Sequence, residues 1–229
     1  MPILNNNFKY GNYHCDIVFC IDASKSMAPV INDIKDFAKL FYQKFLDGME
    51  MADKEVECLR CKVIAFRNYK YDNDPMVESP FYTIPEQKQG FESFLNCIEA
   101  RGGVGGAENA LEAIALALKS NWTTGGFRQR HIIVLFTDAS PVPLGENVDC
   151  VNYSKDMPED LSELGRWWEG ISPIPESTYL GRAGRIIAFV PNTEPWTDLQ
   201  AWNRCLPVFG VIPSDDDLEI IISLLSGAF

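Results

Sequence analysis

The chain has 229 residues, of which 46% are hydrophobic and 23% charged, a composition typical of a globular protein with an ample core. Its formal net charge of -12 at pH 7 argues against electrostatically driven binding to nucleic acid or to anionic lipid. The N-terminus has no charged segment followed by a long apolar run, so we expect neither a signal peptide nor a membrane span. The seven cysteines are an odd number and lie scattered along the chain, which predicts free thiols. Free thiols and the expected lack of an export signal together predict a cytoplasmic location.

The first predicted strand is followed by a row of oxygen-bearing side chains. Residues 1–14 are polar and rich in asparagine, and they predict a surface arm. Residues 17–21 are an apolar run rich in β-branched and aromatic types, which predicts a strand buried on both faces. Asp22, Ser24 and Ser26 follow at every second position, in the loop where an open α/β sheet places hard-cation chemistry. Either serine could instead be the N-cap of the next helix.

Strand and helix patterns continue to alternate along the chain, which indicates an α/β fold. Apolar runs predict further strands at 58–66, 81–84, 132–136, 185–190 and 208–212. Apolar residues at steps of three and four predict helices, which we place at 30–51, 85–100, 107–120, 159–170, 198–204 and 215–225. The segment 68–80 is predicted to be a polar loop. Three acids open the last helix, where the helix dipole favours negative charge.

A second acidic residue is predicted to lie beside the first. The strand at 132–136 ends in Thr137 and Asp138. If it neighbours the strand at 17–21, Asp22 and Asp138 converge in one crevice at the carboxyl edge of the sheet. Two carboxylates placed together repel each other without a cation, so the pattern favours a divalent metal site. We expect Asp22 to lie on a surface loop, where its replacement would leave the fold intact.

These motifs resemble the von Willebrand factor A (VWA) domain family over most of the chain, from about Tyr13 to the last helix. The resemblance implies a Rossmann-like fold, a doubly wound and mostly parallel sheet with helices on both faces and one antiparallel edge strand. It implies a single domain over 15–229, after an arm at 1–14. It also implies a metal-ion-dependent adhesion site that binds Mg²⁺, or Mn²⁺ or Ca²⁺. The matching metal residues are Asp22, Ser24, Ser26 and Asp138.

The second loop of that site departs from the family pattern. Its glycine-rich segment, 101–106, carries Gly105 where the family usually has a threonine ligand. Three consequences are open: a water fills the position, Glu108 reaches in from the predicted helix, or the site binds metal weakly. Mg²⁺ readily keeps several waters, so one missing hydroxyl need not abolish binding. The glycine spacing matches neither a P-loop nor a dinucleotide-binding motif.

A long segment follows Asp138 and is expected to be an insertion. It spans about 140–183, which is more than a strand-to-helix connection normally needs, and it begins at the predicted crevice. Loops at such an edge often carry recognition. Trp167 and Trp168 lie within it, and they either anchor the insertion to the body or form part of a partner-binding surface.

The predicted function is a divalent-metal-dependent protein–protein interaction module. A partner Asp or Glu would complete the metal shell, and neither nucleic acid nor a membrane is expected as a partner. The family resemblance also implies an alternative, a metal-independent scaffold or subunit of a AAA+ ATPase-linked or stress-response complex. An aspartate-dependent phosphotransferase would need a second acid two residues after Asp22, but Ser24 stands there, so we do not expect an enzyme.

Overall fold

The computed structural model describes residues 12–103, 106–174, 177, 180–211 and 214–227. A seven-stranded sheet has the order β3-β2-β1-β6-β8-β9, and β4 also pairs with β2. Its strands are β1 (Tyr13–Asp22), β2 (Val56–Phe66), β3 (Met76–Glu78), β4 (Tyr82–Ile84), β6 (Arg128–Phe136), β8 (Gly184–Val190) and β9 (Cys205–Phe209). Two further short strands, β5 (Ala107–Glu108) and β7 (Ser140–Pro141), pair with each other. The central strands β2, β1, β6, β8 and β9 are parallel.

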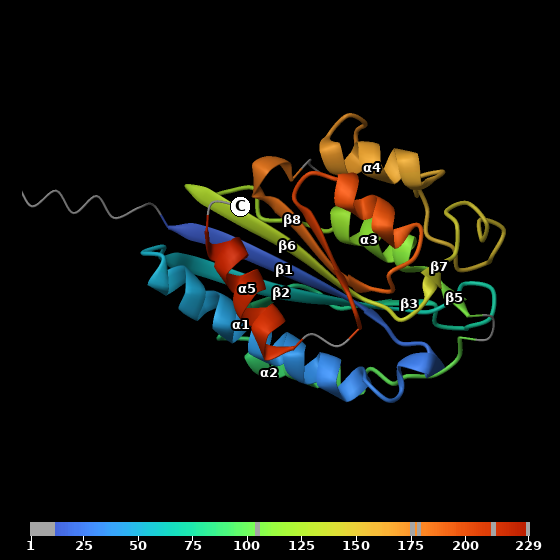
Figure 1. The fold of residues 1–229 in the computed structure, drawn as a ribbon, viewed down its shortest axis with the longest axis horizontal. Coiled ribbons are helices and arrows are strands. Elements are labelled where there is room, and N and C mark those ends of the chain that lie inside the picture. Colours follow the sequence, from blue (N-terminus) through green and yellow to red (C-terminus); the bar gives the residue numbers. More distant parts are fainter. Residues whose placement is uncertain (1–11, 104–105, 175–176, 178–179, 212–213, 228–229) are drawn as a thin grey trace, which may run out of the picture.

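Helices cover both faces of this sheet (Figure 1). One face carries α1 (Ile31–Met51), α2 (Lys88–Cys97) and α5 (Asp215–Ser226), and the other carries α3 (Ala110–Leu118) and α4 (Leu161–Glu169). Short 3-10 helices are η1 (Lys25–Met27), η2 (Gly181–Ala183) and η3 (Trp196–Ala201). Along β1, Ile17, Phe19 and Ile21 enter one hydrophobic core, whereas Val18 and Cys20 enter the other. The strand is apolar because both of its faces are buried, and the predicted doubly wound α/β fold is confirmed.

Several elements differ from the sequence prediction because tertiary pairing sets their ends. The predicted polar loop at 68–80 contains β3, which pairs antiparallel with β2, so β3 and β4 together make the antiparallel edge. Glu108 was predicted in a helix, but it lies in β5, where Ala107 and Glu108 pair with Ser140 and Pro141. Helix α3 therefore starts only at Ala110.

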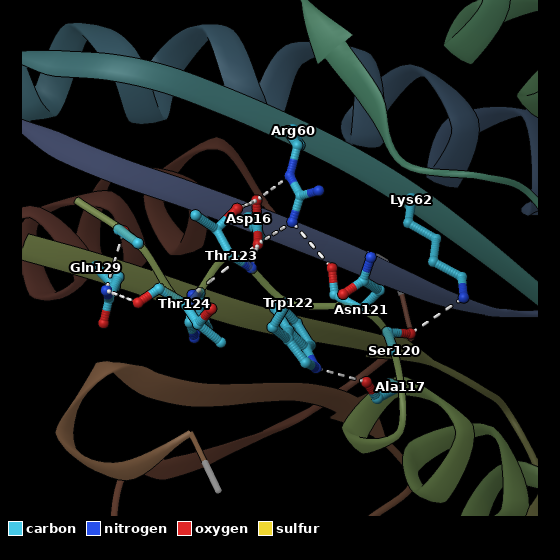
Figure 2. Close-up of polar contacts among 12 residues, drawn as sticks. Asp16, Arg60, Lys62, Ala117, Ser120, Asn121, Trp122, Thr123, Thr124 and Gln129 are labelled. Carbon is cyan, nitrogen blue, oxygen red and sulfur yellow. Dashed lines mark hydrogen bonds and ion pairs between the residues drawn. The ribbon is translucent and has the colours of Figure 1, made fainter. Parts of the chain in front are cut away.

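A buried ion pair ties β1 to β2 and to the segment before β6 (Figure 2). The Arg60 guanidinium donates to both carboxylate oxygens of Asp16, from Nε at 2.8 Å and from Nη2 at 2.7 Å. The Thr123 amide donates to Asp16 Oδ2 at 2.7 Å, and Arg60 also donates to the Asn121 carbonyl. Bidentate pairs of this kind fix geometry as well as charge. Asp16 is therefore structural, a role that its place before an apolar run does not reveal.

The insertion is attached to the body by its two tryptophans. Helix α4 is capped at its start by the Asp160 side chain and ends at Gly170, which has a left-handed conformation. Trp167 is 3% exposed and Trp168 is 1% exposed, and both belong to the core on the α3 face. Trp168 Nε1 donates to the Asn203 carbonyl at 2.7 Å. Of the two alternatives that the sequence left open for Trp167 and Trp168, burial therefore favours anchoring of the insertion, since neither ring is available to a partner.

Helix α5 begins with a capping box. The Ser214 side chain accepts from the Asp217 amide, and the Asp217 side chain accepts from the Ser214 amide. The Asp217 carboxylate thus serves the helix start, as its position in the sequence predicts. Among the described residues, no helix is both long enough and apolar enough to cross a membrane.

Candidate metal site

The carboxyl ends of β1 and β6 bring two acidic residues to the same edge of the sheet. The two strands are parallel neighbours, with Ile21 opposite Phe136. Asp22 is the last residue of β1, and Thr137 and Asp138 follow directly after β6. The two strands are therefore neighbours, as the predicted convergence of Asp22 and Asp138 requires. In Figure 1 this edge lies toward the side where β5 and β7 are labelled.

Asp22 forms the buried floor of the site. Its Oδ1 accepts from the Ser24 amide at 2.8 Å, and its Oδ2 accepts from the Thr137 hydroxyl at 2.6 Å. Thr137 Oγ1 accepts in turn from the Ala139 amide at 3.1 Å. Asp22 is fully buried and not on a surface loop as predicted, because it still belongs to the central strand. Its replacement therefore affects folding energetics as well as the site.

The two serines and Asp138 form a line of oxygen atoms above Asp22. Ser26 Oγ donates to Asp138 Oδ1 at 2.9 Å, which uses its single proton, so Ser24 Oγ is the donor in the 3.0 Å contact with Ser26 Oγ. Ser24 is 1% exposed, whereas Ser26 is exposed and Asp138 half-buried. The line thus runs from the interior to solvent. Ser24 is the N-cap residue of η1 but makes no side-chain capping bond to it, and α1 has Val30 as its N-cap, so neither serine caps a helix with its hydroxyl.

The second loop contributes a buried glutamate. Gly105, the other predicted contributor from this loop, lies outside the described residues. Glu108 is 2% exposed, and its Oε2 has no hydrogen-bond partner in the described part of the chain. A Cβ placed on Gly103, whose φ is +68°, would lie 2.7 Å from Glu108 Oε1 and 2.7 Å from Ser24 Cβ. Gly103, Glu108 and Ser24 are therefore neighbours at the carboxyl edge of the sheet.

The site concentrates negative charge in a poorly solvated place. Burial raises the pKa of Asp22 to about 6, against the lowering effect of the hydrogen bonds from Thr137 and Ser24, and Asp138 raises it further. Burial also raises the pKa of Glu108 to about 8, to which the charges of Asp22, Asp72 and Asp138 add. Carboxylates held this way are stabilised by a proton or by a cation.

Sequence reasoning missed Arg67, which ties the loops around the site together. It is 4% exposed and donates from Nε to the Ala23 carbonyl, from Nη1 to that of Asp74 and from Nη2 to that of Glu99, at 2.8–3.1 Å. These three carbonyls belong to three separate segments of the edge. Its place in the sequence could have indicated this role, because Arg67 directly follows a predicted strand that ends at Phe66. In the structure Phe66 pairs with Asp22, so Arg67 lies at the same edge of the sheet.

The oxygen set fits a hard cation that keeps some of its waters. In the described ranges, no three His, Cys, Asp or Glu side chains form a ready-made metal centre. The atoms that are present are carboxylate and hydroxyl oxygens, which suit Mg²⁺, Mn²⁺ and Ca²⁺ better than softer metals. The buried Glu108 Oε2 has no donor among the described residues, which favours either a proton or a bound ion beside it.

Comparison with known proteins identifies the class and then the family. The central strand β1 of the parallel sheet ends in an acidic residue and is followed by two serines, so the chain is an α/β domain whose carboxyl edge carries the candidate site. The model of the von Willebrand factor type A domain family matches residues 17–140, more than half of the chain. The chain therefore belongs to the VWA family, whose members are in general protein-interaction modules. No curated protein matches it.

Solved structures show the same fold at low sequence identity. The pilus adhesin SpaC from Lactobacillus rhamnosus GG matches with a TM-score of 0.58 and 12% identity, over 93% of this chain and 30% of that one. A von Willebrand factor type A protein from Catenulispora acidiphila matches with a TM-score of 0.52 and 13% identity, over 94% of this chain and 42% of that one. The chain thus spans less than half the length of either structure, and the likeness concerns the fold alone.

Proposed function

We propose that this VWA domain is a metal-dependent protein–protein interaction module. Asp22, Ser24, Ser26 and Asp138 would hold a divalent cation, Mg²⁺ or else Mn²⁺ or Ca²⁺, and an Asp or Glu of a protein partner would complete its shell. The observation that carries the proposal is the hydrogen-bonded line from Ser24 through Ser26 to Asp138 above the buried Asp22. Such a line places hard oxygen ligands along a path from the interior to solvent.

The chain's own residues have distinct parts in this proposal. Thr137 and the Ser24 amide orient the Asp22 carboxylate. Ser24 and Ser26 offer neutral oxygens, which add no negative charge beside the ion. A bound divalent cation would supply an electrophilic centre that attracts a partner carboxylate. The exposure of Ser26 leaves room for that carboxylate to approach, and the buried Asp22 stays behind it.

Loops at the same edge would give the module its specificity. Arg67 fixes the segments at Ala23, Asp74 and Glu99 relative to one another. The insertion reaches this edge too, because the Asn152 side chain donates to the Asn73 carbonyl at 3.2 Å. Recognition sites are commonly built from loops that a rigid sheet holds in place.

The cytoplasm is the proposed location, and an enzymatic role is not proposed. All seven cysteines are free thiols, which are typical of a reducing compartment. The acidic net charge favours a protein partner over nucleic acid or an anionic membrane. Ser24 occupies the place where an aspartate-dependent phosphotransferase needs a second acid.

Partner capture with and without metal tests the proposal. The wild-type chain and a Ser26→Ala variant are used as bait in Mg²⁺ and again in EDTA, and captured proteins are identified by mass spectrometry. We expect one protein to be retained only by the wild type in Mg²⁺, and an Asp or Glu substitution in that protein to release it. Capture that is equal under all conditions would reject metal dependence and favour the metal-independent scaffold.

A further inference from the structure

The insertion carries an apolar hollow that the candidate metal site does not use. The hollow has a volume of about 330 Å³, and its lining includes the apolar side chains of Val148, Met157 and Pro158. It lies on the segment 145–159, between β7 and α4, which Figure 1 shows as a yellow loop on the side where β7 is labelled. Val148 is 55% exposed. A concave apolar surface with an exposed valine favours binding of another molecule, which would bury it.

Contacts with the body of the domain hold the hollow in shape. Tyr153 and Ser154 are part of its lining. The Tyr153 hydroxyl donates to Glu112 Oε1 of α3 at 3.3 Å, and the Tyr153 ring packs against Tyr69, with 4.9 Å between the ring centroids. The hydroxyls of Tyr69 and Ser154 are hydrogen-bonded at 2.8 Å. The hollow is thus largely formed before a partner arrives, which lowers the entropic cost of binding.

The segment around the hollow is acidic. It contains four exposed acidic residues: Glu146, Asp149, Asp156 and Glu159. The last two also line the hollow. Two lysines lie nearby, Lys155 in the segment and Lys119, whose Nζ donates to the carbonyls of Lys155 and Asp156 at 2.8 and 3.3 Å. Within the ranges that the structure describes, no Lys or Arg side chain forms an ion pair with any of the four carboxylates. This excess of negative charge would attract a positively charged partner.

We propose that the hollow binds a segment of a protein partner in which an apolar side chain is flanked by Lys or Arg. The apolar side chain would pack against Val148 and Met157, and the flanking cations would pair with Asp156 and Glu159. An acidic segment would be repelled, so the charges select the partner. The inference rests on the proposed function in assigning both contacts to one partner. The hollow itself contains none of the candidate metal residues.

The chain offers matched controls for both parts of the contact. Val148 and Val151 are both exposed and lie on the same segment, but only Val148 lines the hollow. Val148→Ser is therefore compared with Val151→Ser. The double variant Asp156→Asn, Glu159→Gln is compared with Glu50→Gln, Asp53→Asn at the end of α1. Both pairs are exposed and three residues apart, and both aspartates have a φ of +54°, which asparagine tolerates.

Selection of peptides tests the inference. A library of random 12-residue peptides displayed on phage is selected on the immobilised wild-type chain in EDTA, so that a metal plays no part. We expect enrichment of peptides with an apolar residue flanked by Lys or Arg. Fluorescence anisotropy of an enriched synthetic peptide should show a loss of affinity of roughly fivefold in Val148→Ser, as part of a buried valine is lost. Asp156→Asn, Glu159→Gln should also weaken binding, and salt should weaken binding to the wild type. Neither control should bind more weakly.

The outcomes separate this inference from the proposed function. Enriched peptides without Lys or Arg, or no enrichment at all, would overturn the inference, and so would equal losses in Val148→Ser and Val151→Ser. If the peptide binds as expected in EDTA but partner capture is the same in Mg²⁺ and in EDTA, the hollow stands and the metal dependence is rejected. Capture that requires Mg²⁺ and is unchanged by Val148→Ser would reject the hollow and leave the metal site intact.

Discussion

Replacement of Asp22 by asparagine is expected to stabilise the metal-free protein while removing its metal affinity. Burial raises the pKa of Asp22 from 3.8 to about 6, so the folded state disfavours the ionised carboxylate. At neutral pH this difference in pKa lowers the free energy of unfolding by about 3 kcal/mol, since one pKa unit equals about 1.4 kcal/mol. Asparagine has the shape of the carboxyl group without its charge. The variant should therefore be more stable than the wild type at pH 7.5 in EDTA, by up to about 3 kcal/mol.

The sign of the pH dependence follows from the raised pKa. Between pH 3.8 and about 6 the folded state binds more protons at Asp22 than the unfolded state does, so wild-type stability falls as the pH rises through that range. The advantage of Asp22→Asn should vanish near pH 4 and be complete above pH 6. Urea unfolding in EDTA at pH 4 and at pH 7.5 measures the free energy of unfolding of both proteins. The difference between variant and wild type at each pH cancels the titration of the groups that the two proteins share. A variant less stable than the wild type at pH 7.5 would refute the reasoning.

Three further changes separate site residues from structural ones. Ser26→Ala should abolish Mg²⁺ binding in calorimetry yet change the urea midpoint little, since Ser26 is exposed; unchanged affinity would exclude its hydroxyl as a ligand. Asp16→Asn should lower the free energy of unfolding by about 3 kcal/mol, because it leaves Arg60 without its buried partner, and an unaltered melt would show that the pair contributes nothing. Burial raises the pKa of Glu112 from 4.5 to about 7, so the ionised carboxylate destabilises the folded state at high pH. Glu112→Gln should therefore raise the free energy of unfolding by up to about 3 kcal/mol at pH 8 and leave it unchanged at pH 4. The same pH dependence of the free energy of unfolding in variant and wild type would contradict this.

The position of Asp22 and Asp138 could be predicted because it depends on a general property of parallel sheets. Side chains that follow neighbouring parallel strands meet at the same edge, and two apolar runs that end in aspartate mark such strands in the sequence. The neighbour relation of β1 and β6 is confirmed by their register. The roles of these residues as metal ligands remain predictions.

Features set by tertiary contacts could not be predicted in the same way. Glu108 follows a glycine-rich loop and precedes a helical pattern, so nothing local indicates that Ala107 and Glu108 pair with Ser140 and Pro141. The burial of Asp22 also depends on distant contacts, including the hydroxyl of Thr137 across the sheet. The three hydrogen bonds of Arg67 join carbonyls that are far apart in the chain. Propensity and periodicity describe neighbours along the sequence and carry no information on such contacts.

Anomalous scattering from crystals soaked in Mn²⁺ would test the central claim most directly, because it locates the ion without assumptions about its ligands. We predict one strong peak at the carboxyl edge of the sheet, within about 2.5 Å of the hydroxyl oxygens of Ser24 and Ser26. The peak should be absent from crystals of Ser26→Ala. A peak elsewhere on the protein, or none in crystals where this edge is open to solvent, would contradict a metal-dependent interaction site.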